Sequence, residues 1–248
     1  MRFKALFLVI VLSFVAMANA HAQGERTMYV LKKGVIAAEH AVTDVDSITY
    51  IDKRNSPYYD EGVVINGIKW ATRNVGAPGT FANNPEDAGM LFQFNSRTGW
   101  RINTWPPISS DGSSLNRYWW YQTATQWDSS NDPCPEGWRI PSIQELYNLH
   151  QYYNNRDGDD DFMGWTTTPA DGINFGTADN LLFLPYAGSI GVAMSGDPTN
   201  NPNPGYWCNE IASNKIVFLT FSPIDVLLNS LNSYPVGSCA FCIRCVAK

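Results

Sequence analysis

The sequence predicts an α+β fold in which short antiparallel strands accompany one main helix. Many short apolar or alternating runs are bounded by Gly, Pro and Asn, a pattern typical of strands joined by turns. One stretch, beginning at Ser142, combines a helix start signal with helical spacing of apolar residues. Charged residues are only 16% of the composition, which suits a loop-rich extracellular β protein better than a cytosolic helical enzyme.

Residues 1–22 are predicted to be a secretory signal peptide. Arg2 and Lys4 precede an apolar stretch over residues 5–17, and small residues follow at Ala18 and Ala20. The apolar stretch is shorter than the roughly 18 residues that a membrane helix needs. We therefore expect export through the Sec pathway, to the periplasm, the cell surface or the extracellular space, and no membrane span.

The net charge argues against a nucleic-acid partner. The formal charge is −6, and loss of Arg2 and Lys4 with the signal peptide makes it −8 (−6 minus 2). An acidic chain without a basic cluster is a poor candidate for binding nucleic acid or anionic lipid.

Residues 23–55 are predicted to form a small N-terminal β segment. Residues 27–33 and 35–41 are expected to be two strands around a turn at Gly34, and residues 44–51 alternate polar and apolar like a third strand. So short a segment cannot hold a large core. The main domain is therefore expected over residues 56–248.

Within the main domain the expected strands are short and the loops are long. Asn66-Gly67 is a strong two-residue turn signal that predicts a hairpin over residues 63–72. A Gly-, Pro- and Asn-rich loop over residues 188–205 is longer than a connection requires. Further strands are predicted at residues 90–94, 138–140, 181–185, 206–209, 215–221 and 237–246, with 225–231 either strand or loop.

The stretch from residue 131 to residue 149 predicts a turn followed by the main helix. Pro133 and Pro135 restrict the backbone on both sides of Cys134. Ser142 and Glu145 have the spacing of a capping box, so a helix is expected from residue 143 to about residue 153. Three apolar residues at helical spacing are expected to face the core: Ile143, Leu146 and Leu149.

Six stretches also occur in a characteristic order: GIKWATRNVG (67–76), PEDAG (85–89), residues 131–149, LFLPYAG (182–188), GYW (205–207) and IRCV (243–246). This succession resembles the Fibrobacter succinogenes major paralogous domain, a family of surface and secreted proteins of Bacteroidetes-type bacteria. The resemblance implies a fold similar to C-type lectin-like and formylglycine-generating-enzyme domains. Such folds have paired antiparallel sheets, one or two helices, long loops, and N- and C-terminal strands lying side by side. The family name itself carries almost no functional information.

The resemblance also implies a disulfide between Cys134 and Cys245, whose closed loop of about 110 residues would stabilise the fold by a few kcal/mol. Cys208 would then have to pair with Cys242 or Cys239, leaving one odd thiol. A zinc site formed by the last three cysteines with Cys208 is the alternative. Strand geometry opposes it, because residues three apart on a strand point to opposite faces.

An acidic loop after the helix raises the question of calcium. Asp157, Asp159 and Asp161 alternate as in a calcium-binding loop, but Phe162 stands where such a loop needs Gly and Thr168 cannot close it as an acid. A solvated acidic loop is the simpler interpretation. We therefore expect no cofactor, with calcium as the alternative.

Aromatic and amide side chains are the candidate ligand contacts. Trp and Tyr stack on sugar rings and anchor protein interfaces. If residues 118–121 form a strand, Trp119 and Tyr121 face one way and Tyr118 and Trp120 the other, so at most one pair lies outward. Core packing is the alternative for each aromatic. The candidates are Trp105, Trp119, Trp120, Tyr121, Trp127, Asn200, Asn201 and Asn203.

No catalytic motif is evident. A Gly-x-Ser-x-Gly elbow, a His-Glu-x-x-His pair and a phosphate loop are all missing from the sequence. The function expected is a secreted or cell-surface binding module, such as an adhesin or pilus-associated component, whose loops contact a glycan, a protein or other surface subunits. The alternatives are a formylglycine-generating-enzyme-like oxidase on the same fold and a purely structural surface subunit.

Overall fold

The computed structural model describes residues 27–32, 35–41, 56–101, 107–113, 124–155, 164–167, 170–190, 204–212, 215–231 and 239–248. The chain divides into two compact units, Met1–Tyr50 and Ile51–Lys248. The predicted signal peptide and the strand predicted at residues 44–51 lie outside the described residues.

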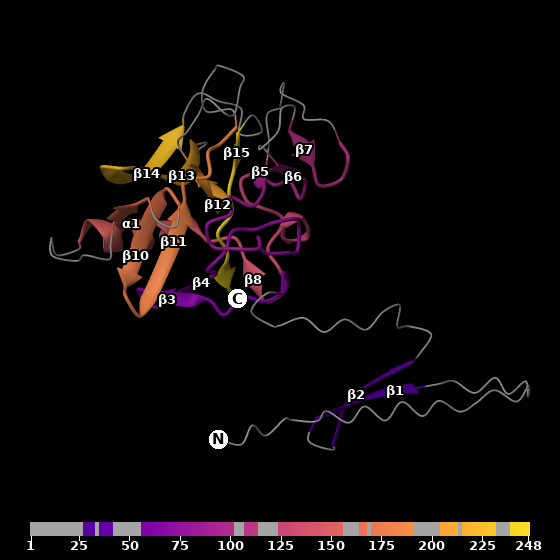
Figure 1. Ribbon diagram of the computed structural model, residues 1–248. Coiled ribbons are helices and arrows are strands. Elements are labelled where there is room, and N and C mark those ends of the chain that lie inside the picture. The colour runs from indigo at the N-terminus through magenta and orange to yellow at the C-terminus, as the bar shows by residue number, and fades with distance from the viewer. Residues whose placement is uncertain are drawn as a thin grey trace, which may run out of the picture. The chain divides into compact units, whose positions relative to one another are not determined.

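In the first unit the described residues form a β-hairpin (Figure 1). Strand β1 (Thr27–Lys32) pairs antiparallel with β2 (Val35–Ala41), and the register shifts between Val30 and Leu31. The two strands predicted around Gly34 are thus confirmed.

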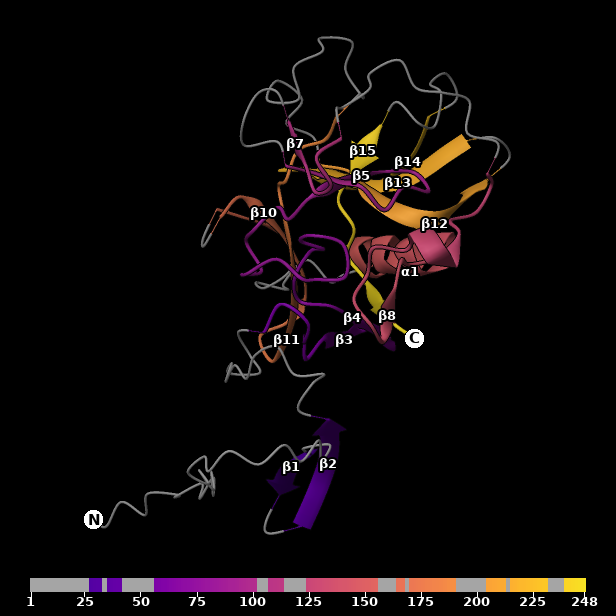
Figure 2. The same ribbon diagram turned by 90° about the vertical axis from the view of Figure 1, so that its right-hand side faces the viewer.

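The described part of the second unit contains four antiparallel sheets and one α-helix (Figures 1 and 2). The α+β prediction is therefore confirmed at this level. The first sheet, called the terminal sheet, has the order β3 (Val63–Ile65), β4 (Ile68–Trp70), β16 (Val246–Ala247) and β8 (Trp138–Arg139). The second, called the loop-bearing sheet, has the order β15 (Ala240–Phe241), β5 (Leu91–Gln93), β6 (Gly99–Arg101) and β7 (Ile108–Ser109).

The other two sheets each have three strands. One has the order β12 (Tyr206–Ala212), β13 (Lys215–Ser222) and β14 (Asp225–Leu231), so the segment left open between strand and loop is a strand. The other has the order β11 (Asn180–Pro185), β10 (Gly172–Thr177) and β9 (Gly164–Thr166).

The helix α1 (Ile143–Asn154) begins where the sequence predicted. The hydroxyl of Ser142 accepts a hydrogen bond from the backbone N–H of Glu145, and the Glu145 carboxylate accepts one from the Ser142 N–H, which completes the capping box. Arg139 adds a bidentate ion pair to Glu145, with N–O distances of 2.8 and 2.7 Å. These bonds fix the junction between β8 and the helix.

The hairpin between β3 and β4 confirms its turn signal. Asn66 and Gly67 both have positive φ, 48° and 78°, as a type I′ turn requires. Val63 and Ile65 are buried while Val64 is exposed, so one face of β3 covers the core.

The last strand was predicted wrongly as one element over residues 237–246. It divides into β15 and β16, which belong to different sheets. Between them the backbone leaves the loop-bearing sheet and bonds to the segment after β4: Val75 N–H donates to Ile243 and Ala71 N–H donates to Cys245. The break also places the side chain of Arg244 in the core. As the resemblance implied, the final strand lies between β4 and β8, beside the strands that open the unit.

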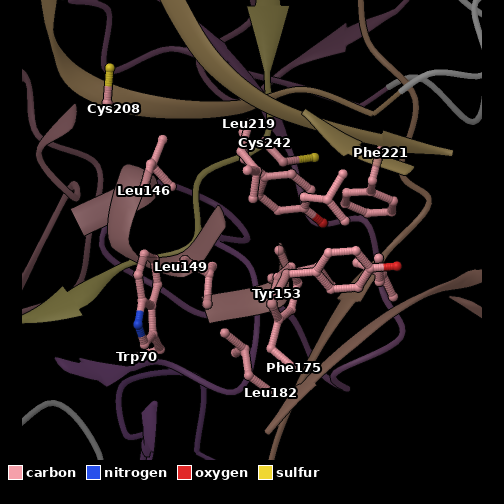
Figure 3. Packing of buried hydrophobic residues seen from close by; sticks show 14 of the residues in the cluster. Trp70, Leu146, Leu149, Tyr153, Phe175, Leu182, Cys208, Leu219, Phe221 and Cys242 are labelled. Atoms are coloured by element: carbon pink, nitrogen blue, oxygen red, sulfur yellow. The ribbon is translucent and has the colours of Figure 1, made fainter. Parts of the chain in front are cut away.

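Two apolar clusters form the core. The first joins the helix to the β10–β11 and β13–β14 hairpins, and Figure 3 shows Tyr153 of α1 beside Phe175, with ring centroids 5.7 Å apart. Burying each such side chain contributes roughly 1.5–3 kcal/mol. The second is rich in aromatic rings packed between β12–β13 and the loop-bearing sheet; contacting pairs are Phe94–Trp207, Trp207–Phe241 and Phe218–Phe241, with ring centroids 5.5, 4.6 and 4.5 Å apart.

Candidate functional site

Four connections of the second unit have at least one described end beside the loop-bearing sheet, whereas residues 156–163 join α1 to β9. Residues 102–106 join strands β6 and β7 of the loop-bearing sheet, and residues 114–123 follow β7 after Ser113. Residues 191–203 begin after Ile190, whose backbone exchanges two 3.0 Å hydrogen bonds with Ala240 of β15. They end before Gly205, whose carbonyl accepts from Cys242 directly after β15. Residues 232–238 lead into Cys239 and β15.

The terminal sheet lies at the other end of the unit. In Figures 1 and 2 the labels β3, β4 and β8 gather near the C-terminus, away from β5, β7 and β15. The fold therefore separates the strands that open and close the unit from the sheet that carries the long connections. This loop-bearing end is the candidate functional site.

The described surface of this end combines apolar, cationic and anionic groups. Ile108 is 55% exposed and pairs across the strands with Arg101, which is also exposed. Nearby, the carboxylate of Asp111 accepts hydrogen bonds from the Ser113 N–H at 3.0 Å and the Thr98 hydroxyl at 2.7 Å. Hydrogen bonds from the Ser113 side chain, the Ser113 backbone and Thr98 hold the pKa of Asp111 below its usual range, so the group is anionic at neutral pH.

A second set of bonds fixes the backbone next to this surface. Asn95 has a φ of 56°, and its side-chain oxygen accepts from the Asp128 N–H at 2.8 Å and the Asn131 amide at 3.3 Å. Arg97 donates to the carbonyl of Asp132 at 2.7 Å. The turn between β5 and β6 thereby holds the segment from Asp128 to Asp132. The sequence analysis did not single out Asn95, Arg97 or the residues of the exposed surface, because none of them belongs to a motif.

Trp127 is the ligand candidate that the structure describes, and it lies in the core. It is 9% exposed, its ring contacts Phe94 and Trp207 at centroid distances of 5.2 and 6.1 Å, and its N–H donates to the carbonyl of Asn131. Core packing, the alternative left open for each aromatic, is therefore its role, and the interpretation as a ligand contact is corrected. The remaining ligand candidates lie outside the described residues: Trp105, Trp119, Trp120, Tyr121, Asn200, Asn201 and Asn203.

Cys134 and Cys245 form the disulfide that the resemblance implied, across 111 residues of sequence. It ties the proline-rich turn to the residue before β16. Beside it the carboxylate of Asp132 accepts from the backbone N–H groups of Cys134 and Ile140, at 2.8 and 3.3 Å. Burial raises the pKa of Asp132 despite these two bonds. The disulfide and the Asp132 carboxylate therefore both form bonds within the folded framework.

The second disulfide expected for Cys208 is not formed. Cys208, Cys239 and Cys242 are buried thiols. Burial raises the pKa of both Cys208 and Cys242 to about 12, so these two side chains are protonated at neutral pH and poorly nucleophilic. The alternative zinc set is also not formed, because Cys245 is bonded to Cys134.

No group of three or more His, Cys, Asp or Glu in the described part of the chain is arranged to hold a metal ion. The calcium candidates Asp157, Asp159 and Asp161 lie outside the described residues. The described helix is too short and too polar to cross a membrane.

Two buried polar networks hold the terminal end together. Asp60 accepts hydrogen bonds from Gly62 N–H, from the backbone and hydroxyl of Thr72, and from Arg73 at 3.1 Å. Arg73 also donates to the carbonyls of Tyr59 and Ala82.

The other network joins the two halves of the chain. Arg244 donates to the Asn74 side chain at 2.8 Å and to the carbonyl of Ala71 at 3.2 Å. Asn74 donates in turn to the carbonyl of Ala88 and to the Tyr206 hydroxyl. Burial lowers the pKa of Arg244. The motif stretches 67–76 and 243–246 therefore meet through structural hydrogen bonds.

No protein-family model, curated protein or solved structure matches the chain.

Proposed function

We propose that the second unit is an exported binding module with a C-type lectin-like fold, whose loops contact a glycan or a protein. The observation that carries this proposal is that the loop-bearing sheet and the terminal sheet lie at opposite ends of the second unit (Figures 1 and 2). Four of its connections have at least one end beside the loop-bearing sheet, while the opening and closing strands meet in the terminal sheet. A rigid scaffold that gathers long loops at one end is a common way to build a binding surface.

The same proposal places the chain with the Fibrobacter succinogenes major paralogous domain. Two contacts support this relation. Stretches 67–76 and 243–246 meet through the hydrogen bond between Asn74 and Arg244. Cys134 and Cys245 form the disulfide that the resemblance implied.

The chemistry of the connections favours a neutral or weakly charged ligand. Trp119, Trp120 and Tyr121 offer rings that stack on sugar faces. Asn200, Asn201 and Asn203 offer amides that both donate and accept hydrogen bonds, as sugar hydroxyls require. We assign the protein the role of an adhesin or pilus-associated component on the exported side of the membrane.

The ligand is tested by applying the purified protein to a glycan array and to a pull-down from cell-surface extract. Trp119→Ala/Tyr121→Ala is compared with Tyr118→Ala/Trp120→Ala, since a strand over residues 118–121 would direct at most one pair outward. One of the two double variants should lose roughly tenfold in affinity, about 1.4 kcal/mol, while the other keeps it. Val64→Ala, at an exposed position of the terminal sheet, is the matched control. No ligand in either assay, or equal affinity in both double variants, would contradict the proposal.

Export is tested separately by mass spectrometry of the protein recovered from the exported fraction. The mature chain should begin at or just before residue 23, after one of the small-residue sites. Retention of residues 1–17 in the recovered protein would contradict the prediction that residues 1–22 are a cleaved signal peptide.

A further inference from the structure

Strand β14 forms one edge of its sheet. It pairs with β13 over seven successive residues without a register shift, and it stands last in the order β12-β13-β14. No other strand in the described part of the chain pairs with it. Its pairing with β13 is thus regular along the whole strand, and a regular edge strand is the form of edge that accepts another strand.

The side chains of β14 leave this edge apolar. Val226 is buried and Leu228 packs against the first core cluster, so one face of the strand is covered. On the other face Leu227 is 47% exposed, and at the adjoining turn Ile224 is 91% exposed. Proteins usually protect an exposed edge with Lys, Pro, a bulge or a very short strand. Residues 225–231 contain none of these devices, and Asp225 at the first position is their one charged residue.

We propose that β14 pairs antiparallel with β14 of a second copy of this chain, which joins two three-stranded sheets into one sheet of six strands across a two-fold axis. A two-fold contact is self-complementary, and the apolar side chains of one copy then lie beside those of the other. The proposal is independent of the ligand proposed above, because it uses the α1–β14 side of the unit and not the loop-bearing sheet.

The positions of Asp225 and Lys215 favour antiparallel pairing with a second copy. Lys215 immediately precedes Ile216, the partner of Leu231, so it lies at the opposite end of the sheet from Asp225. Antiparallel pairing brings Asp225 of each copy toward Lys215 of the other, two strands or about 10 Å away, within the range of screened attraction. Parallel pairing would instead place the two Asp225 carboxylates together.

The neighbouring helix surface also permits self-association. The formal charge of −6 makes two copies repel over most of their surfaces. However, α1 packs against β14, and its exposed side chains Gln144, Tyr147 and Asn154 carry no charge. The exposed side chains of α1 therefore add no charge repulsion to this contact.

The test is sedimentation velocity of the purified protein from roughly 1 to 200 µM, the range of a weak specific dimer. We expect the measured mass to rise from one copy to two. Asp225→Lys should raise the dissociation constant about threefold to tenfold, and the charge swap Asp225→Lys/Lys215→Asp should restore it. Both residues are exposed, so these variants are expected to fold.

A second variant does not depend on the charge pair. Leu227→Lys places a charge from each copy on the same face of the joined sheet and should shift the protein to one copy, whereas Val64→Lys on β3 should not. Circular dichroism verifies that each variant is folded. A mass of one copy throughout the range, an unchanged constant in Leu227→Lys, or failure of the charge swap to restore association would overturn the proposal.

Discussion

The terminal end and the loop-bearing end of the second unit use polar residues in opposite ways. At the terminal end Asp60, Arg73 and Arg244 are buried, and each bonds to backbone or side chains of the scaffold. At the loop-bearing end Arg101 and Asp111 are exposed beside Ile108. The motifs most visible in the sequence therefore build the framework, whereas Arg101, Ile108 and Asp111 belong to no motif.

The largest expected effect lies in the buried network at the terminal end. Asp60→Ala removes the partner of Thr72, Gly62 and Arg73 and leaves a buried guanidinium without its carboxylate. Breaking a buried pair in this way costs about 3–5 kcal/mol of unfolding free energy. Urea denaturation followed by fluorescence measures it. A loss below about 1 kcal/mol would show that this network does not hold the terminal end.

The disulfide comes next. Cys134→Ser should lower the unfolding free energy by about 2–5 kcal/mol, because the unfolded chain regains the freedom of a long loop. The double variant Cys134→Ser/Cys245→Ser should lose about as much as the single one, since either change breaks the same bond. Additive losses in a denaturant titration would contradict a shared bond.

The helix junction gives a smaller and pH-dependent effect. Burial alone would raise the pKa of Glu145, but hydrogen bonds from Arg139 and Ser142 outweigh burial and lower it. A lowered pKa in the folded state means that the ionised group stabilises the fold above the unfolded pKa, and that this stabilisation disappears as pH falls through the folded value. Glu145→Gln should cost about 1 kcal/mol at pH 7.

The difference between wild type and Glu145→Gln should shrink as the pH is lowered from about 5 to about 3, following protonation of the carboxylate. Thermal unfolding at several pH values measures this difference. A difference that stays constant across the interval would mean that the ionised form of Glu145 contributes nothing.

The smallest stability effect is expected at the loop-bearing end. Arg101→Ala and Ile108→Ala change exposed side chains, so each should alter the unfolding free energy by no more than about 0.5 kcal/mol. The same denaturation experiment measures it. A large loss of unfolding free energy would show that Arg101 and Ile108 stabilise the fold, as the buried residues of the terminal end do, and would contradict the difference between the two ends.

The sequence predicted elements that depend on local signals. The capping box of Ser142 and Glu145 and the turn at Asn66-Gly67 each specify their own geometry within four residues, so both elements were confirmed. The strand predicted at 237–246 failed because its break is caused by distant partners. Ala71 and Val75 bond to this segment from more than 160 residues earlier in the chain, and no local residue encodes that contact.

The residues of the candidate surface were also hard to predict, because their contacts are made with residues distant in the sequence. Trp127 looked suited to ligand contact, yet Phe94 and Trp207, distant in sequence, enclose its ring. Arg101 and Ile108 meet only through the pairing of β6 with β7. Side-chain chemistry alone does not distinguish an enclosed tryptophan from an outward one, because both are apolar rings in a loop-rich segment.

We expect binding to reside at the loop-bearing end. The direct measurement compares wild type, Arg101→Ala/Ile108→Ala and the terminal-sheet variant Val64→Ala/Lys69→Ala on one glycan array and in one surface-extract pull-down. The account predicts that the first variant loses roughly tenfold or more in affinity at unchanged stability, while the second binds like wild type. Loss of binding in the terminal-sheet variant, with full binding in the loop-bearing one, would contradict it.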